Sequence, residues 1–342
     1  MDIWKYLKET ELPVVLYGMG NGADRIVEKL SQCGKSISGI FVSDGFVRNK
    51  IIHGHSLCTY GDMKKKYPRF IVLVAFGTQL PEVMENIKRI SKEQEVYAPY
   101  LPVCGGDFVT DEYIQAHESD FEFVRSILCD EKSKHDFYLC MKYRLTGDIK
   151  HLFESESEKS EFYRILNLSD EEVYIDLGAY RGDTVCEFIE NTCGYNRIIA
   201  LEPDVKTYRK LEENTKDMQN IELYNAAVGE KSHTAFFSMQ GGRQSKLSDS
   251  GRECKVLSVD DILKGDKATY IKFDVEGAEK EAIAGAKITI SRYKPKMLVS
   301  AYHRTDDLFE IARQVLSIRP DYKVYFRRPP YVPDWDCAFL FV

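Results

Sequence analysis

The sequence predicts an α/β protein with two parallel-sheet domains and a helical segment between them. Two apolar runs, at 14–17 and 173–176, are each followed by a turn that contains glycines and then by a stretch with helical periodicity. After each turn, short β-type runs alternate with amphipathic stretches, which is typical of an open parallel sheet covered by helices. The length of 342 residues also suits about two domains. Both domains are therefore expected to be Rossmann-like, with ligands at the carboxyl ends of their strands.

Composition and charge narrow the classes of function. Hydrophobic residues make up 44% of the chain, which indicates globular domains rather than a disordered chain. The net charge of −7 argues against nucleic acid as the main partner. No secretory leader is expected, and no apolar run approaches the roughly 20 residues that a membrane span needs. The nine cysteines contain no Cys-x-x-Cys pair, which favours reduced thiols and a cytoplasmic protein.

Residues 1–105 are expected to form the first domain, and the charged residues 106–168 a helical connecting segment. The β-type runs and the amphipathic runs of the first domain alternate in the order expected for a parallel sheet. Its predicted strands are 14–17, 38–42, 70–76 and 95–98, and its predicted helices are 23–32, 61–67 and 81–91.

Residues 169–342 are expected to form the second domain. The Gly/Ser-rich stretch 240–251 is predicted to be an insertion after its third strand. The last two apolar runs, 322–326 and 337–342, are separated by a short Pro-rich loop, so they are expected to end the sheet as an antiparallel hairpin. The other predicted strands are 173–176, 197–201, 221–227, 269–273 and 297–301, and the predicted helices are 205–214, 278–286 and 306–317.

The second glycine turn and a downstream acid carry the most specific functional signal. Gly178 and Gly182 allow the backbone to approach a ligand and the next helix to pack on the strand. Glu202 follows Asp176 by 26 residues, at the end of the next strand, where a carboxylate can accept from both hydroxyls of a ribose. Asp176 would repel a pyrophosphate but attract a methionine ammonium. This half is therefore predicted to bind S-adenosylmethionine rather than NAD, and the alternative is a purely structural turn.

These residues resemble the FkbM family of S-adenosylmethionine-dependent methyltransferases. The resemblance rests on four segments, DLGAYRGDT (176–184), EPD (202–204), NAAVG (225–229) and KFDVEGAE (272–279). It covers about 171–342 and implies a class I methyltransferase fold that methylates hydroxyl oxygens of sugars or natural products. One departure is Tyr180, which stands where this family often has Asn. The implied cofactor-binding residues are Asp176, Gly178, Ala179, Tyr180, Gly182, Asp183, Thr184, Glu202, Pro203, Asn225 and Ala226.

Asp274, Glu276 and His303 are the predicted catalytic residues. Asp274 and Glu276 follow the strand 269–273 and would share one face while the strand lasts. A carboxylate or a neutral imidazole there can take the proton of an alcohol during methyl transfer. The alternatives are a pair of ligands for a divalent metal, acids favoured by a helix N-terminus, and a structural histidine. No metal ligand is assigned.

The first glycine turn has a less specific pattern. Gly18, Gly20 and Gly22 open a helix, and Asp44 follows Gly18 by 26 residues. A helix N-terminus with bare amides can bind a pyrophosphate, but the spacing differs from Gly-x-Gly-x-x-Gly. This half loosely resembles nucleotide-binding domains that precede sugar-modifying modules of polysaccharide pathways. NAD, a nucleotide-sugar and no ligand remain open for it.

Together these predictions describe an O-methyltransferase that uses S-adenosylmethionine and acts on a sugar, a sugar-nucleotide or a related small molecule. The amino-terminal half would help to hold the acceptor, and a homo-oligomer is compatible with the sequence. One alternative is an NAD(P)-dependent oxidoreductase, against which stands the lack of a persuasive Tyr-x-x-x-Lys arrangement. Another is a binding module for NAD or a nucleotide-sugar with a degenerate methyltransferase half, which Tyr180 would favour.

Overall fold

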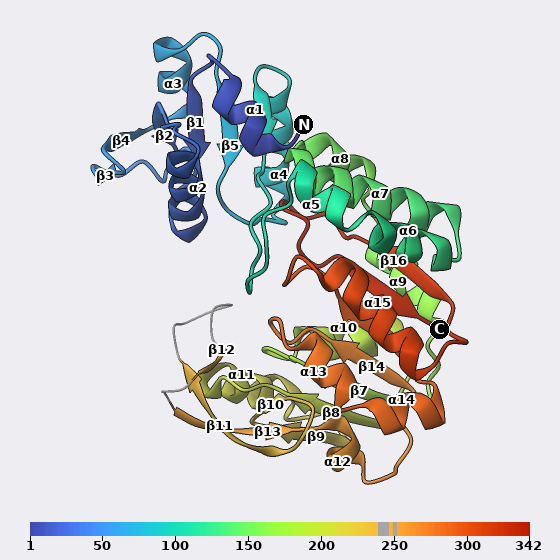
Figure 1. Cartoon of the computed structure of the whole chain (residues 1–342). Helices are drawn as coiled ribbons and strands as arrows, with labels where there is room; N and C mark the ends of the chain where they lie inside the picture. Colours follow the sequence, from blue (N-terminus) through green and yellow to red (C-terminus); the bar gives the residue numbers. More distant parts are fainter. Residues whose placement is uncertain (239–245, 249–251) are drawn as a thin grey trace.

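The computed structural model describes residues 1–238, 246–248 and 252–342. Two sheets with their covering helices lie at opposite ends of the molecule, and the helices α5 to α8 lie beside the junction (Figure 1). The predicted α/β class with mainly parallel sheets is confirmed. Within the described ranges, no helix is long and apolar enough to cross a membrane.

The amino-terminal sheet has the strand order β3-β4-β2-β1-β5-β6. All its neighbouring strands are parallel except β3, which pairs antiparallel with β4. Apolar side chains of α1 and α2 pack on one face of the sheet, and those of α3 and α4 pack on the other. The strands are β1 (Val14–Tyr17), β2 (Gly39–Phe41), β3 (Ile51–Ile52), β4 (His55–Cys58), β5 (Ile71–Val74) and β6 (Glu95–Tyr97), and the helices are α1 (Ile3–Glu9), α2 (Asn21–Gln32), α3 (Tyr60–Lys66) and α4 (Pro81–Ser91).

The hairpin of β3 and β4 is not among the predicted strands of the first domain. β3 has two residues and β4 has four, so neither is long enough to show a clear alternation of apolar and polar side chains. His53 and Gly54 both have positive φ, as a tight hairpin turn requires. The hairpin places β4 parallel to β2 at the edge of the sheet.

Five helices connect the two sheets and contribute to both cores. On α7, Phe137 and Cys140 belong to the carboxyl-terminal core, whereas Tyr143 belongs to the amino-terminal core. The segment therefore holds the two sheets together by packing rather than as a loose linker. The helices are α5 (Asp111–Ala116), α6 (Glu118–Ile127), α7 (Glu131–Thr146), α8 (Ile149–Glu154) and α9 (Lys159–Leu166).

The carboxyl-terminal sheet has the order β16-β17-β15-β14-β7-β8-β9. β15, β14, β7, β8 and β9 are parallel, and β17 runs antiparallel to both β15 and β16, which confirms the predicted antiparallel end. Apolar residues of α9, α10 and α11 pack on one face, and those of α13, α14 and α15 on the other. The strands are β7 (Val173–Leu177), β8 (Arg197–Leu201), β9 (Ile221–Tyr224), β14 (Tyr270–Phe273), β15 (Lys296–Ser300), β16 (Val324–Arg327) and β17 (Ala338–Phe341), and the helices are α10 (Asp183–Asn191), α11 (Val205–Thr215), α12 (Val259–Leu263), α13 (Glu279–Ala284), α14 (Lys287–Tyr293) and α15 (Asp307–Ile318).

A small second sheet follows β9, with the order β10-β13-β11-β12. The single strand predicted at 221–227 is wrong, because β9 ends at Tyr224 and the chain continues after Asn225 into a strand of this other sheet. Of the predicted insertion 240–251, only 246–248 lies within the described residues. The strands are β10 (Ala226–Val228), β11 (His233–Ser238), β12 (Lys246–Ser248) and β13 (Arg252–Leu257).

Candidate functional site

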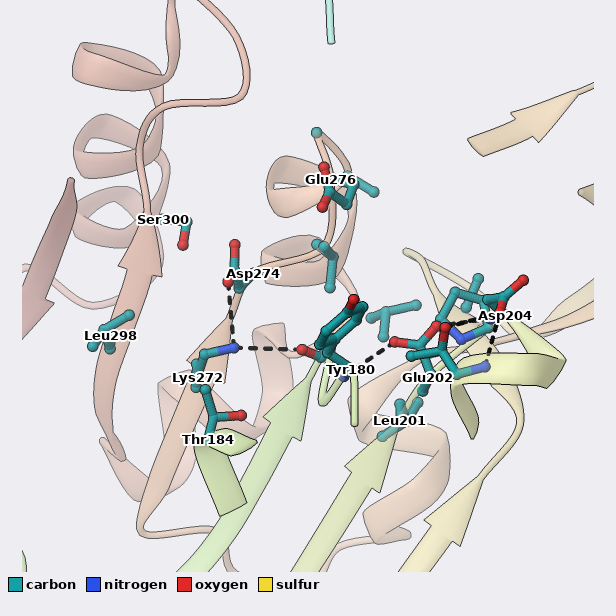
Figure 2. Close-up of a pocket in the computed structure, with 18 of the residues that line it drawn as sticks. Tyr180, Thr184, Leu201, Glu202, Asp204, Lys272, Asp274, Glu276, Leu298 and Ser300 are labelled. Carbon is teal, nitrogen blue, oxygen red and sulfur yellow. Dashed lines mark hydrogen bonds and ion pairs between the residues drawn. The ribbon is translucent and has the colours of Figure 1, made fainter. Parts of the chain in front are cut away.

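A cavity of about 1660 Å³ opens at the carboxyl ends of β7, β8, β14 and β15 (Figure 2). This is the edge at which parallel sheets bind ligands. The predicted site residues divide into two groups with respect to it. Those that line it are Gly178, Tyr180, Asp183, Thr184, Glu202, Pro203, Ala226, Asp274 and Glu276. Those that do not line it are Asp176, Ala179, Gly182, Asn225 and His303.

The turn after β7 depends on two glycines with positive φ. A Cβ on Gly178 would lie 1.9 Å from the carbonyl oxygen of Asp274, so any side chain is sterically excluded there. A Cβ on Gly182 would lie 3.1 Å from the side chain of Leu211 on α11. The two glycines therefore let the turn pack against the loop after β14 and against α11, in addition to leaving the backbone open to a ligand.

Tyr180, the departure from the family pattern, places its ring in the cavity. Its φ is +49° and its side chain is 48% exposed, with the guanidinium of Arg181 4.8 Å from the ring centre. Figure 2 shows the ring between Asp274 and Glu202. An exposed aromatic face at this position is available for contact with a bound molecule.

Asp176 is fully buried and is held by protein groups. The residue beside it in the strand register is Lys272, whose Nζ lies 3.3 Å from Oδ1 of Asp176, and the Thr184 hydroxyl donates to Oδ2. Burial lowers the pKa of Lys272, but Asp176 and Asp274 raise it more, so the ammonium stays charged. Lys272 thus supplies a positive charge beside Asp176. The expected contact of Asp176 with a methionine ammonium stays a prediction.

Glu202 presents its carboxylate at the end of β8. It accepts hydrogen bonds from the backbone N–H of Tyr180 (3.1 Å) and of Asp204 (2.8 Å), and it is 8% exposed. Burial raises its pKa to about 7. The Asn225 side chain donates to the carbonyl oxygens of Glu202 and Pro203 and so holds this loop, and its contact with a cofactor stays a prediction.

Asp274 lies among a phenol, an ammonium and an imidazole at the cavity wall. The hydroxyl of Tyr302 donates to its Oδ1 at 3.1 Å, and its Oδ2 lies 3.5 Å from Nζ of Lys272. Burial raises the pKa of Asp274, but Lys272 and the imidazole of His303 lower it more, so the pKa lies below its ordinary value. Asp274 is therefore a charged group that accepts hydrogen bonds at the cavity wall.

His303 lies behind this wall, fully buried. Its Nε2 is 3.4 Å from Oε2 of Glu276, and its Nδ1 is 2.9 Å from Oε1 of Glu279. Burial lowers the pKa of His303, but Glu279 and Glu276 raise it well above the ordinary value. In this structure the ring is buried among carboxylates and does not line the cavity, and a role of His303 in taking the acceptor proton stays a prediction.

Glu279 belongs to this cluster, and sequence reasoning missed it. Its Oε1 accepts a hydrogen bond from the backbone N–H of Val275 at 2.9 Å, which holds the loop that carries Asp274 and Glu276. In the sequence, Glu279 is one more acid at a helix N-terminus. Only its 2.9 Å approach to His303, which is distant in sequence, marks it as part of the site.

The amino-terminal half supplies one wall of the cavity. Cys104 donates its backbone N–H to the carbonyl oxygen of His303 at 2.8 Å and its thiol to that of Glu276 at 3.1 Å. Gln79, which follows β5, also lines the cavity. Because these contacts join residues far apart in the chain, no local motif could have identified them.

The first glycine turn is used for packing. A Cβ on Gly22 would lie 2.3 Å from the carbonyl oxygen of Ala75, and one on Gly18 would lie 2.4 Å from the ring of Phe76. These glycines let α2 and the preceding turn approach the end of β5. Binding of NAD or a nucleotide-sugar at this turn stays a prediction.

The comparison with family models matches residues 176–324 to the methyltransferase FkbM domain. A search of curated proteins found no match. Among solved structures, methyltransferase FkbM from Methylobacillus flagellatus KT superposes with a TM-score of 0.75 at 22% identity, over 97% of this chain and 90% of that chain. This likeness supports the fold of both halves.

Two further solved structures resemble about half of the chain. One is precorrin-6y C5,15-methyltransferase from Geobacter metallireducens GS-15, with a TM-score of 0.35 at 14% identity over 55% of this chain and 93% of that chain. The other is fibrillarin from Aeropyrum pernix in complex with S-adenosyl-L-methionine, with a TM-score of 0.34 at 14% identity over 54% of this chain and 73% of that chain.

Proposed function

We propose that this chain, whose carboxyl-terminal half contains an FkbM-family methyltransferase domain, transfers a methyl group from S-adenosylmethionine to a hydroxyl oxygen of a small molecule. One observation carries the proposal. A single cavity is lined both by Glu202, at the end of β8, and by Asp274 and Glu276, after β14. Donor and acceptor can therefore bind side by side, which an in-line transfer requires.

The residues at the end of β8 fit an adenosyl cofactor. Both carboxylate oxygens of Glu202 accept a backbone hydrogen bond, which fixes the group while each oxygen keeps capacity for a ribose hydroxyl. The exposed ring of Tyr180 lies beside it (Figure 2), and Gly178, in the turn after β7, lines the same cavity. S-adenosylmethionine, when bound, supplies a methyl group on a positively charged sulfur.

The groups after β14 suit an acceptor that carries hydroxyls. Asp274 and Glu276 line the cavity and can each accept a hydrogen bond from a hydroxyl. Lys272 and Tyr302 hold the Asp274 carboxylate in place, so little reorganisation is needed when the acceptor binds. Sugars and sugar-nucleotides present several hydroxyls to such carboxylates, and we propose them as the acceptor class.

Titration of the purified chain with S-adenosylmethionine and S-adenosylhomocysteine tests the cofactor assignment. We expect micromolar dissociation constants that rise roughly 10- to 100-fold in Glu202→Gln, because two charge-assisted hydrogen bonds to the ribose are weakened. Glu213→Gln, an exposed acid on α11, is the matched control and should bind as the unchanged chain does. No binding of either compound, together with binding of NAD, would contradict the proposal and favour a site in the amino-terminal half.

The affinity for S-adenosylhomocysteine is expected to depend on pH. The ionised Glu202 accepts the ribose hydrogen bonds, and its pKa in the free protein is about 7. Lowering the pH through that value protonates the group, so affinity should fall by about tenfold between pH 8 and pH 6. Calorimetry over this range measures the effect. A slope as steep in Glu202→Gln would assign the dependence to another group.

A further inference from the structure

The side chains around His303 form a group of potential metal ligands at the cavity wall. Oδ1 of Asp274 and Oε2 of Glu276 lie 3.8 and 3.4 Å from Nε2 of His303, and Oε1 of Glu279 lies 2.9 Å from Nδ1. Asp274, Glu279 and His303 each offer one ligand atom within 4.8 Å of the other two. These three residues can thus hold one ion together, and Glu276 lies next to them, beside Nε2 of the same imidazole.

Polar atoms of this cluster are buried without hydrogen bonds inside the described part of the chain. They are Oε2 of Glu276, Oε2 of Glu279, Oδ1 of Asp307 and both ring nitrogens of His303, and these ring nitrogens lie at ion-pair distance from Glu276 and Glu279 but outside hydrogen-bond geometry. His303 and Glu279 are at most 1% exposed. Since buried polar atoms are nearly always paired, this concentration of them points to a ligand that they bind together.

The charges show which kind of ligand fits. Asp274, Glu276, Glu279 and the neighbouring Asp307 bring four carboxylates to one imidazole. Of these four carboxylates, Nζ of Lys272 forms an ion pair with Asp274, at 3.5 Å from its Oδ2. The same ammonium also pairs with Asp176.

The guanidinium of Arg304 is turned to the carbonyl oxygen of Gly277, to which its Nε donates at 2.9 Å. It therefore lies beside the carboxylate cluster rather than inside it. A proton on His303 relieves part of the repulsion between these carboxylates, and a divalent cation that displaces this proton brings one more positive charge among them.

We propose that Asp274, Glu276, Glu279 and His303 bind one divalent cation. Carboxylate oxygens with one imidazole suit Mn²⁺ or Mg²⁺ rather than an ion that prefers thiolates. Asp274 and Glu276 line the cavity, so the cation faces the acceptor and can bind its hydroxyl oxygen, which lowers the pKa of that hydroxyl. The site goes beyond the proposed methyl transfer, and it extends the divalent-metal alternative for Asp274 and Glu276 by two further ligands, Glu279 and His303.

Titration of the metal-free, full-length chain with Mn²⁺ tests the site, with free Mn²⁺ measured by electron paramagnetic resonance. We expect one Mn²⁺ per chain with a micromolar dissociation constant, weakened by about tenfold or more in Glu276→Gln. Glu213→Gln, which changes an exposed acid on α11 outside the cavity, is the matched control and should bind Mn²⁺ unchanged. No cofactor or acceptor is present, so failure of this proposal is distinguishable from failure of the proposed methyl transfer.

Two results would overturn the site. One is the lack of saturable Mn²⁺ binding up to millimolar concentrations. The other is equal affinity of Glu276→Gln and the unchanged chain. Circular dichroism during thermal unfolding shows whether each variant folds. Should Glu276→Gln fail to fold, Asp274→Asn is titrated in its place, with the same expected loss.

Discussion

Asp274→Asn is expected to lower the rate of methyl transfer by roughly 100-fold or more while S-adenosylhomocysteine still binds within about threefold of the original affinity. The carboxylate lines the cavity and is oriented by Lys272 and Tyr302. An amide cannot offer the same charged acceptor to a hydroxyl, and it removes one of the two carboxylates beside Lys272. The cofactor's ribose lies at Glu202 in our proposal, so its binding should be kept.

The measurement combines an acceptor screen with calorimetry. Sugars and sugar-nucleotides are screened as acceptors, and the S-adenosylhomocysteine formed from the methyl donor is measured. The variant is then assayed with the first acceptor that reacts. Asp217→Asn, at an exposed site outside the cavity, serves as the control for the same chemical change. Turnover that survives in Asp274→Asn would remove this residue from catalysis.

Asp334→Ala is expected to lower the free energy of unfolding by about 3–5 kcal/mol, because it leaves a buried arginine without its counter-ion. Oδ2 of Asp334 lies 2.5 Å from Nε of Arg144 on α7, and both side chains are at most 1% exposed. The same guanidinium donates to the carbonyl oxygens of Ala301 (2.9 Å) and Thr305 (3.4 Å). This ion pair therefore ties the connecting helices to the loop that carries His303.

Denaturation by urea or by heat measures the loss. Asp321→Ala removes an exposed partner of Arg319 and should leave the unfolding midpoint nearly unchanged, since surface ion pairs contribute little. The double variant Arg144→Met with Asp334→Leu should recover much of the stability, because it replaces the buried pair by apolar groups. An unaltered midpoint in Asp334→Ala would show that the pair does not hold the two parts together.

Particular elements show how far the sequence could be interpreted. The β7 turn and the acid after β8 are local patterns, in which glycine spacing and strand ends lie close together along the chain, and the structure places Glu202 and Asp274 at one cavity. The small sheet of β10 to β13 was missed because residues 221–227 look like one strand. The chain in fact passes from one sheet to the other at Asn225. The hairpin of β3 and β4 was missed because its strands are too short to show a period.

The sequence by itself determined the fold class, the strand–turn–helix units and the polar residues at the strand ends. Each of these depends on residues that are close together in the sequence. Only the tertiary structure decided which of these groups meet. Asp176 pairs with Lys272, and His303 is buried among carboxylates that include Glu279. Cys104 donates its thiol hydrogen to the carbonyl oxygen of Glu276. Charge state and accessibility follow from such long-range contacts, since burial and neighbouring charges set each pKa, and these are properties of the folded chain.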